Sequence, residues 1–309
     1  MFATRPIPGI RRRRCAEPRT TGLVIALLVG WAGSAAGQAD SATWNAVGRT
    51  LQTPPTAAAG YTRYNFPRRD ITLHIGDVTV APSLALGAWA GFAGTRDSAV
   101  AMGDLVLLGA ELPSVLRQLQ QASFSVEAIH NHLAGESPAI SYVHFHGEGP
   151  ALALATAVDS ALRRTATPRP VAMAAPEPLT IDTAAVFSTL GLRGRAAGGV
   201  AQVSAVLVPG TVTMHGKTLV PALAYGSPIN LQAVSAERMV GTGDFAILEE
   251  RVAGLVAALA DHHITATAMH SHLVGESPRV YYIHFWADGT PADVLAGLRA
   301  ALDAAGHRP

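Results

Sequence analysis

The sequence predicts an α+β protein made of two tandem related domains, each an antiparallel sheet with helices packed on one face. Three observations predict this class. A stretch of 20 residues occurs twice, at 130–149 and 270–289, with 11 identical positions and no gap. A proline-rich segment separates the two copies. Each copy also has the element order β-α-β-β-α, preceded by additional strands, which is typical of helices on one face of an antiparallel sheet.

The first 36 residues differ in composition from the rest of the chain. Four consecutive arginines, 11–14, precede an apolar run from Leu23 to Trp31, and small residues follow up to Ala36. This order is that of a secretory signal peptide, and the run is too short to span a bilayer comfortably. We therefore expect a signal peptide at 1–36, a periplasmic or secreted location, and no membrane span in the mature chain. Both the Sec and the twin-arginine export routes remain open.

The composition of the remaining chain excludes several classes of protein. Hydrophobic residues make up 49% of the sequence and charged residues 15%, which allows a sizeable core. The single cysteine, Cys15, lies in the expected signal peptide, so the mature protein would have no disulfide and no thiolate metal site. It would carry 17 basic and 21 acidic residues, and this net charge of −4 argues against a nucleic-acid partner.

The repeats and the prolines give the domain boundaries. We expect a first repeat domain at 37–164 and a second at 180–309. The segment 165–179 between them contains four prolines and several alanines, a composition typical of a stiff linker.

Alternation and β-branched content predict the strands, and apolar residues at helical spacing predict the helices. In the first copy we expect strands at 61–66, 71–75, 78–81, 99–108, 125–133 and 140–146. The helices are expected near 41–49, at 111–122 and at 150–164. In the second copy one helix is expected at 249–261, and Thr290 with Pro291 is a typical start of the last helix.

The repeated stretch predicts a histidine-rich hairpin. If Ser137 is the centre of the turn, His130 lies opposite His144, and His132 lies opposite Tyr142. All four side chains then share one face of the sheet. Directly opposed Cβ atoms lie roughly 4.5 to 5.5 Å apart, so the imidazoles can converge on one ion.

The second copy repeats this block with one difference. His270, His272, Tyr282 and His284 occupy the same positions, but Trp286 stands where the first copy has His146. His146 offers a fourth nitrogen, so we expect the first hairpin to hold a metal more tightly than the second.

These blocks predict a metal or small-ligand site in each repeat. Three histidines with a carboxylate or water suit a divalent metal, and zinc is the first candidate. The metal ligands we expect are His130, His132, His144, His146, His270, His272 and His284. We expect Tyr142 and Tyr282 to contact a small-molecule ligand, and Glu136 and Glu276 to act as general bases if the site is catalytic.

An alternative interpretation is a non-catalytic ligand- or protein-binding module of the cell envelope. The histidines and tyrosines would then form structural ladders across each hairpin. The sequence leaves open whether the protein is an enzyme, and it does not give the oligomeric state.

Several other residues have structural interpretations. Phe145 and Phe285 alternate with the histidine face and are expected in the core. Asp104 and Asp244 each follow a glycine and are expected in turns. The sequence also predicts exposed positions for three residue sets: His74, His215 and the Arg68-Arg69 pair.

The repeated motifs resemble those of the LppY/LpqO-type exported bacterial proteins. The segments that carry the resemblance are 103–107, 128–132 and 142–146 in the first copy, with 268–272 and 282–286 in the second. The resemblance covers about residues 40–160 and 180–305. It implies export and two tandem copies of a domain of unknown function, and no established reaction. The named members are lipoproteins, whereas this chain lacks a lipobox cysteine after the apolar run.

Overall fold

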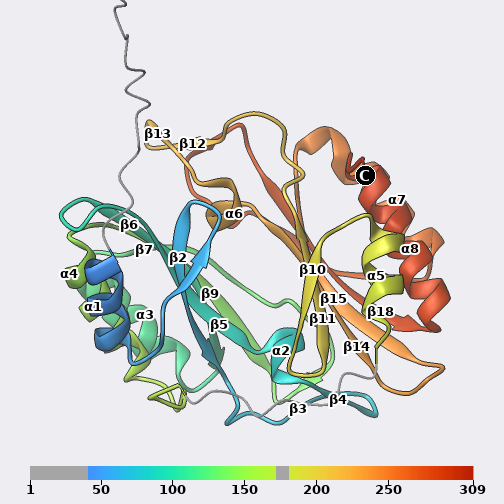
Figure 1. Ribbon diagram of the computed structural model, residues 1–309, viewed down its shortest axis with the longest axis horizontal. Coiled ribbons are helices and arrows are strands. Elements are labelled where there is room, and N and C mark those ends of the chain that lie inside the picture. The colour runs from blue at the N-terminus through green and yellow to red at the C-terminus, as the bar shows by residue number, and fades with distance from the viewer. Residues whose placement is uncertain (1–40, 172–180, 309) are drawn as a thin grey trace, which may run out of the picture. The chain divides into compact units, whose positions relative to one another are not determined.

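The computed structural model describes residues 41–171 and 181–308, which lie in one compact unit. The expected signal peptide and most of the expected linker fall outside these residues. Within them, each repeat supplies four helices, one six-stranded sheet and one three-stranded sheet (Figure 1). No helix in the described part of the chain has the length and apolar character needed to cross a membrane.

The helices of the first repeat are α1 (Ser41–Leu51), α2 (Pro82–Ala85), α3 (Leu112–Gln121) and α4 (Ala151–Leu162). Its strands are β1 (Thr56–Ala58), β2 (Tyr61–Pro67), β3 (Leu73–Ile75), β4 (Val78–Val80), β5 (Gly87–Gly94), β6 (Ala99–Leu108), β7 (Ser125–His130), β8 (Glu136–Ser137) and β9 (Ile140–Gly149).

The helices of the second repeat are α5 (Thr183–Leu190), α6 (Pro221–Ala224), α7 (Glu249–Asp261) and α8 (Pro291–Ala304). Its strands are β10 (Gly194–Ala197), β11 (Val200–Ala205), β12 (Thr213–Met214), β13 (Lys217–Thr218), β14 (Ser227–Ala233), β15 (Met239–Ile247), β16 (Thr265–His270), β17 (Glu276–Ser277) and β18 (Tyr281–Gly289).

The two large sheets have the same strand order. The first runs β1-β2-β5-β6-β9-β7 and the second β10-β11-β14-β15-β18-β16, with antiparallel pairing throughout. Helices α1, α3 and α4 lie on one side of the first sheet, and α5, α7 and α8 lie on one side of the second (Figure 1). The predicted α+β class with two similar domains is confirmed.

Local sequence explains most of these elements. Thr290 accepts a hydrogen bond from the Asp293 backbone N–H at the start of α8, as its sequence predicts. Phe145 and Phe285 lie in the two cores at 1% and 0% exposure, also as expected. Strand β5 has no clear signal in the sequence, because its residues are mostly glycine and alanine, which have low strand propensity.

The predicted hairpin around Ser137 is wrong. Strand β7 ends at His130, and the following segment leaves the large sheet. Its strand β8 pairs with β3 in the separate three-stranded sheet. In the observed register His130 lies opposite Tyr142, and Ala128 lies opposite His144. This differs from the expected register by two residues, and an even shift keeps the same side chains on the same face. His130 and His144 therefore still share a face, although they are not direct partners.

The two repeats interlock through their short helices. On one side, Gln202 Nε2 donates to the Ser83 carbonyl of α2 at 3.0 Å, and Asn230 Nδ2 donates to the Leu84 carbonyl at 2.9 Å. On the other side, Leu223 of α6 packs so closely on β5 that a Cβ at Gly91 would lie 2.5 Å from it. Each repeat therefore completes the packing of its partner repeat.

Arg68 is buried, although the sequence analysis placed it in solvent. Its side chain has 0% exposure and pairs with Asp70 at 2.8 Å and with Glu111 at 2.7 Å. Nη1 also donates to the Val106 carbonyl at 2.7 Å. These acceptors offset the cost of burying a guanidinium. Arg69 is exposed, and so are His74 and His215, as expected.

Candidate metal centre

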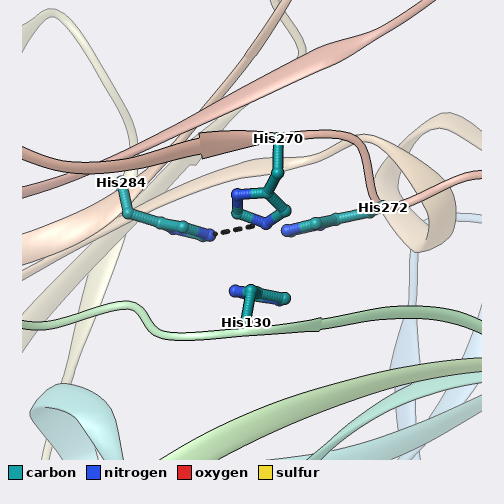
Figure 2. Close-up of side chains that lie close together, drawn as sticks. All are labelled: His130, His270, His272 and His284. Atoms are coloured by element: carbon teal, nitrogen blue, oxygen red, sulfur yellow. Dashed lines mark hydrogen bonds between the residues drawn. The ribbon is translucent and has the colours of Figure 1, made fainter.

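Six histidines from the two repeats meet in one place. We define the inter-repeat cluster as these histidines together with Asp104 and Asp244; the histidines are His130, His132, His144, His270, His272 and His284. The sequence analysis expected two separate sites, one in each hairpin. His130, His132 and His144 of the first repeat do form one group able to share an ion. Figure 2 shows in addition that His130 points towards His270, His272 and His284 of the second repeat.

The rings pair across the repeats in a nearly symmetric way. The ring centroids of His130 and its repeat equivalent His270 are 4.0 Å apart. His132 lies 3.9 Å from His284, and His144 lies 3.8 Å from His272. These last two pairs exchange under the 140-residue offset, so the cluster has a pseudo-twofold arrangement.

Each loop histidine is held between two other rings. His132 stacks on Tyr142 of its own repeat at 3.7 Å and on His284 of the other repeat. His272 stacks on Tyr282 at 3.7 Å in the same way. The tyrosine hydroxyls donate to the carbonyls of Ala85 and Ala224, at 2.7 and 2.8 Å. Both hydroxyls are thus engaged with backbone, and the part of Tyr142 and Tyr282 in ligand binding stays a prediction.

Two aspartates complete the cluster, and the sequence analysis assigned them wrongly to turns. Asp104 lies within β6 and Asp244 within β15, and each is the cross-strand partner of a histidine, His144 or His284. Asp244 Oδ1 is 2.5 Å from His284 Nδ1 and 3.7 Å from His132 Nδ1. Asp104 Oδ2 is 3.7 Å from His132 Nε2. His132 therefore lies between carboxylates that come from different repeats.

A signal for these aspartates was present in the sequence. The dipeptide Gly-Asp occurs in both copies at the 140-residue offset, inside an apolar run. The glycine has a packing reason, because a Cβ at Gly103 would lie 2.4 Å from the Trp89 carbonyl oxygen. At Gly243 it would lie 2.1 Å from the Pro228 carbonyl oxygen. Each glycine is therefore explained by close packing between strands and not by a turn. The aspartate that follows it lies at a buried strand position.

The cluster is partly to fully buried and is short of hydrogen-bond partners: Asp104, Asp244, His272 and His284 are buried, and the other four histidines are half-buried. Within the described residues, seven buried side-chain atoms of the cluster make no hydrogen bond: Asp104 Oδ1, His130 Nε2, His132 Nε2, His144 Nε2, Asp244 Oδ1, His272 Nε2 and His284 Nδ1. Although His284 Nδ1 and Asp244 Oδ1 approach closely, they lack the geometry of a hydrogen bond. Unpaired buried polar atoms are costly, so their convergence indicates a bound ion or ligand.

Burial also sets the protonation of the cluster. It lowers the pKa of His132, His144 and His272 well below the ordinary value, and the neighbouring imidazoles lower it further. The same causes lower the pKa of His270 to about 4. Burial, followed by the nearby Asp244 carboxylate, raises the pKa of Asp104 well above its usual range. These four imidazoles are therefore neutral near pH 7, which is the form that binds metals.

Besides the two tyrosines that stack on the cluster, three of the expected site residues lie outside it. His146 pairs instead with Glu148, whose Oε1 is 3.6 Å from its Nε2. Glu276 is buried and accepts from the Val280 backbone N–H at 3.2 Å. Glu136 is half-buried in β8. The structure does not bring these three residues among the groups able to share an ion.

Three such groups occur in the described part of the chain. They are His130 with His270, His272 and His284; His130 with His132 and His144; and His132 with Asp244 and His284. In each group the donor atoms lie within 4.8 Å of one another. Two of the three groups mix residues of both repeats, so a bound ion would link the repeats.

Comparison with known families identifies both repeats. Residues 45–164 and 184–304 each match the family described as "Domain of Unknown Function (DUF1259)". The chain belongs to this family. The two matches cover both halves of the inter-repeat cluster, and they confirm that the DUF1259 domain occurs here twice in tandem.

Other comparisons add little to the family assignment. No curated protein matches the chain. One solved structure that aligns is the fused permuted hexameric shell protein from the RMM microcompartment. It shares 15% identity over 69% of this chain and 87% of that chain, with a TM-score of 0.18. A TM-score this low supports no argument about fold or function.

Proposed function

We propose that this protein binds a divalent metal, with zinc as the first candidate, at one centre shared by its two repeats. The observation that carries the proposal is the convergence of six histidines and two aspartates, seven of whose buried side-chain atoms lack hydrogen-bond partners. Imidazole nitrogens and carboxylate oxygens together suit zinc and its neighbours in the first transition row. The proposal includes export by the signal peptide at 1–36 and an LppY/LpqO-type assignment within the family.

The cluster can also serve chemistry if a substrate reaches it. A bound divalent ion would polarise a substrate oxygen or lower the pKa of a bound water. Glu136 and Glu276 lie outside the cluster, so Asp104 and Asp244 are better placed than either to hold a proton there. Metal-dependent hydrolysis or redox chemistry is therefore a further part of this proposal.

The second candidate function is the non-catalytic binding module. Ring stacking favours it, because His132 and His272 are each held between a tyrosine and a histidine. In that case the cluster would be a structural ladder that joins the repeats without an ion.

Metal titration of the full chain separates these functions. We expect zinc to co-purify without added metal, and His132→Ala and His272→Ala each to weaken zinc binding. Loss of a supporting partner typically costs about 10- to 100-fold in affinity, and loss of a direct ligand should exceed that. His74→Ala is the matched control, because His74 is exposed and bonds only to Thr79 among the described residues.

The two single variants also test whether the centre is shared. With one shared centre, each variant lowers the affinity for all of the bound zinc. With two independent hairpin sites, each variant would leave half of the zinc bound at full affinity. Unchanged zinc binding in the His132/His272 double variant would favour the structural ladder.

A further inference from the structure

Beside the inter-repeat cluster, the contact between the repeats has two flanks that differ in sequence. We define each flank by the residues where one large sheet meets the small hairpin of the other repeat. Under the 140-residue offset, Ser98 corresponds to Arg238, His146 to Trp286, and Glu148 to Asp288. The central cluster keeps its residue types, so this difference is local to the flanks.

The flank at the end of β18 is closed. Arg238 pairs with Asp288 of its own repeat at 2.8 Å and with Asp77, in the β3–β4 hairpin of the other repeat, at 2.7 Å. Trp286 packs against a hydrophobic cluster made mostly of first-repeat residues, which also includes Val200 and Val240 of the second repeat. A cation and an aromatic ring thus fill this flank together.

The flank at the end of β9 is open. Ser98 and His146 replace the two large side chains, and Lys217 of the β12–β13 hairpin pairs with Glu148. A pocket of about 560 Å³ lies there, within the usual range for small-molecule sites. Its apolar lining includes Met102, Met214, Leu219 and Leu223. Lys217 is the only lysine of the chain.

We infer that this pocket binds a zwitterionic small molecule with an apolar body, of the class of α-amino acids with a large aliphatic or aromatic side chain. The apolar body would occupy the space that Trp286 fills in the other flank. The ligand carboxylate would pair with Lys217 and the ligand ammonium with Glu148. These two side chains already lie together at the mouth, at 59% and 34% exposure, and present one charge of each sign.

His146 provides a polar wall beside the charged pair. Its ring is 7% exposed, and its Nε2 is 3.6 Å from Glu148 Oε1. The pocket therefore offers one ammonium, from Lys217, and the carboxylates of Glu148 and Asp97, beside the His146 imidazole. Groups of both signs at one pocket favour a ligand that carries both charges.

Calorimetry on the full chain tests the ligand class with three probes of the same aliphatic body. L-leucine carries both charges, 4-methylpentanoate lacks the ammonium, and 3-methylbutylamine lacks the carboxylate. Charge-assisted hydrogen bonds are worth enough that each missing group should weaken binding about tenfold or more. Failure of L-leucine to bind the wild type, or equal binding of all three probes, would overturn the ligand class.

Two variants test the location. Ser98→Arg with His146→Trp places the two large side chains of the closed flank in the open one and should abolish L-leucine binding by filling the pocket. Lys217→Met keeps the pocket and should weaken L-leucine about tenfold while leaving 3-methylbutylamine unchanged. Because Lys217 is largely exposed, its variant remains informative even if the filled variant does not fold. Unchanged L-leucine binding in Lys217→Met would overturn the assignment to this pocket.

Discussion

The inter-repeat cluster has identical residues in the two repeats, whereas its two flanks have different ones. In the cluster, every residue of the first repeat has an identical partner in the second: three histidines and one aspartate on each side. In the flanks, Ser98 and His146 of the first repeat stand against Arg238 and Trp286 of the second. After duplication, the centre has kept one chemistry twice, and the flanks have diverged into one closed side and one open pocket.

This difference indicates how the two copies divide their tasks. A centre that takes donors from both repeats needs both sets, so loss of either set would damage the whole. The residues of one flank do not depend on those of the other flank, so the residues of either flank can change separately. The pseudo-twofold ring contacts of 4.0, 3.9 and 3.8 Å show how closely the centre keeps its symmetry.

The largest expected effect lies in the core of the first repeat. Arg68→Met should lower the free energy of unfolding by about 3–5 kcal/mol, because it leaves Glu111 and Asp70 without their buried partner. Urea unfolding measures this change. Arg117→Met, at an exposed position of α3, is the control and should stay within about 0.5 kcal/mol of the wild type. A loss as small as that of the control would show that the ion pair does not stabilise the first repeat.

The next effect tests the symmetry of the cluster. Asp104→Asn and Asp244→Asn should each weaken zinc binding about 10- to 100-fold, since an amide keeps the shape but cannot become the carboxylate that holds a metal or its ligands. Similar losses are expected because His132 lies between both carboxylates. Zinc titration of both variants measures the losses, and Asp303→Asn on α8 is the exposed control. A loss confined to one aspartate would assign the centre to one repeat.

The sequence predicted the fold class because repetition and alternation are local patterns. The even spacing of His130 and His132, and of Tyr142 and His144, indicates a common face in either of two registers that differ by two residues. The shift from the expected register therefore moved His144 from His130 to Ala128 as a cross-strand partner without changing its face.

The parts that could not be predicted depend on contacts between distant segments. The Glu-Ser segment at 136–137 pairs with β3, about 60 residues earlier, rather than forming a tight turn. Nothing in a local pattern shows that the histidine faces of two repeats meet each other. The repeated Gly-Asp dipeptide was a signal for Asp104 and Asp244, but no local pattern shows their partners, because these lie on neighbouring strands and, for the pair of His132 with Asp244, in different repeats.

The smallest effect concerns the two tyrosines that support the loop histidines. Tyr142→Phe and Tyr282→Phe keep the ring against His132 or His272 but remove the hydrogen bond to the Ala85 or Ala224 carbonyl. Each should lower the free energy of unfolding by about 1 kcal/mol. Zinc affinity should change little, because the ring that holds the imidazole remains.

Urea unfolding and zinc titration of the same two variants check both statements. Tyr281→Phe is the control, because the Tyr281 hydroxyl makes no hydrogen bond within the described residues. Equal losses in the free energy of unfolding for Tyr142→Phe and Tyr282→Phe would show that the two tyrosines contribute equally, as the symmetry of the cluster predicts. A large fall in zinc affinity for either variant would instead show that its hydroxyl positions the histidine or reaches the ion. A fall confined to one variant would show that the two tyrosines have different roles despite the symmetric arrangement of the rings.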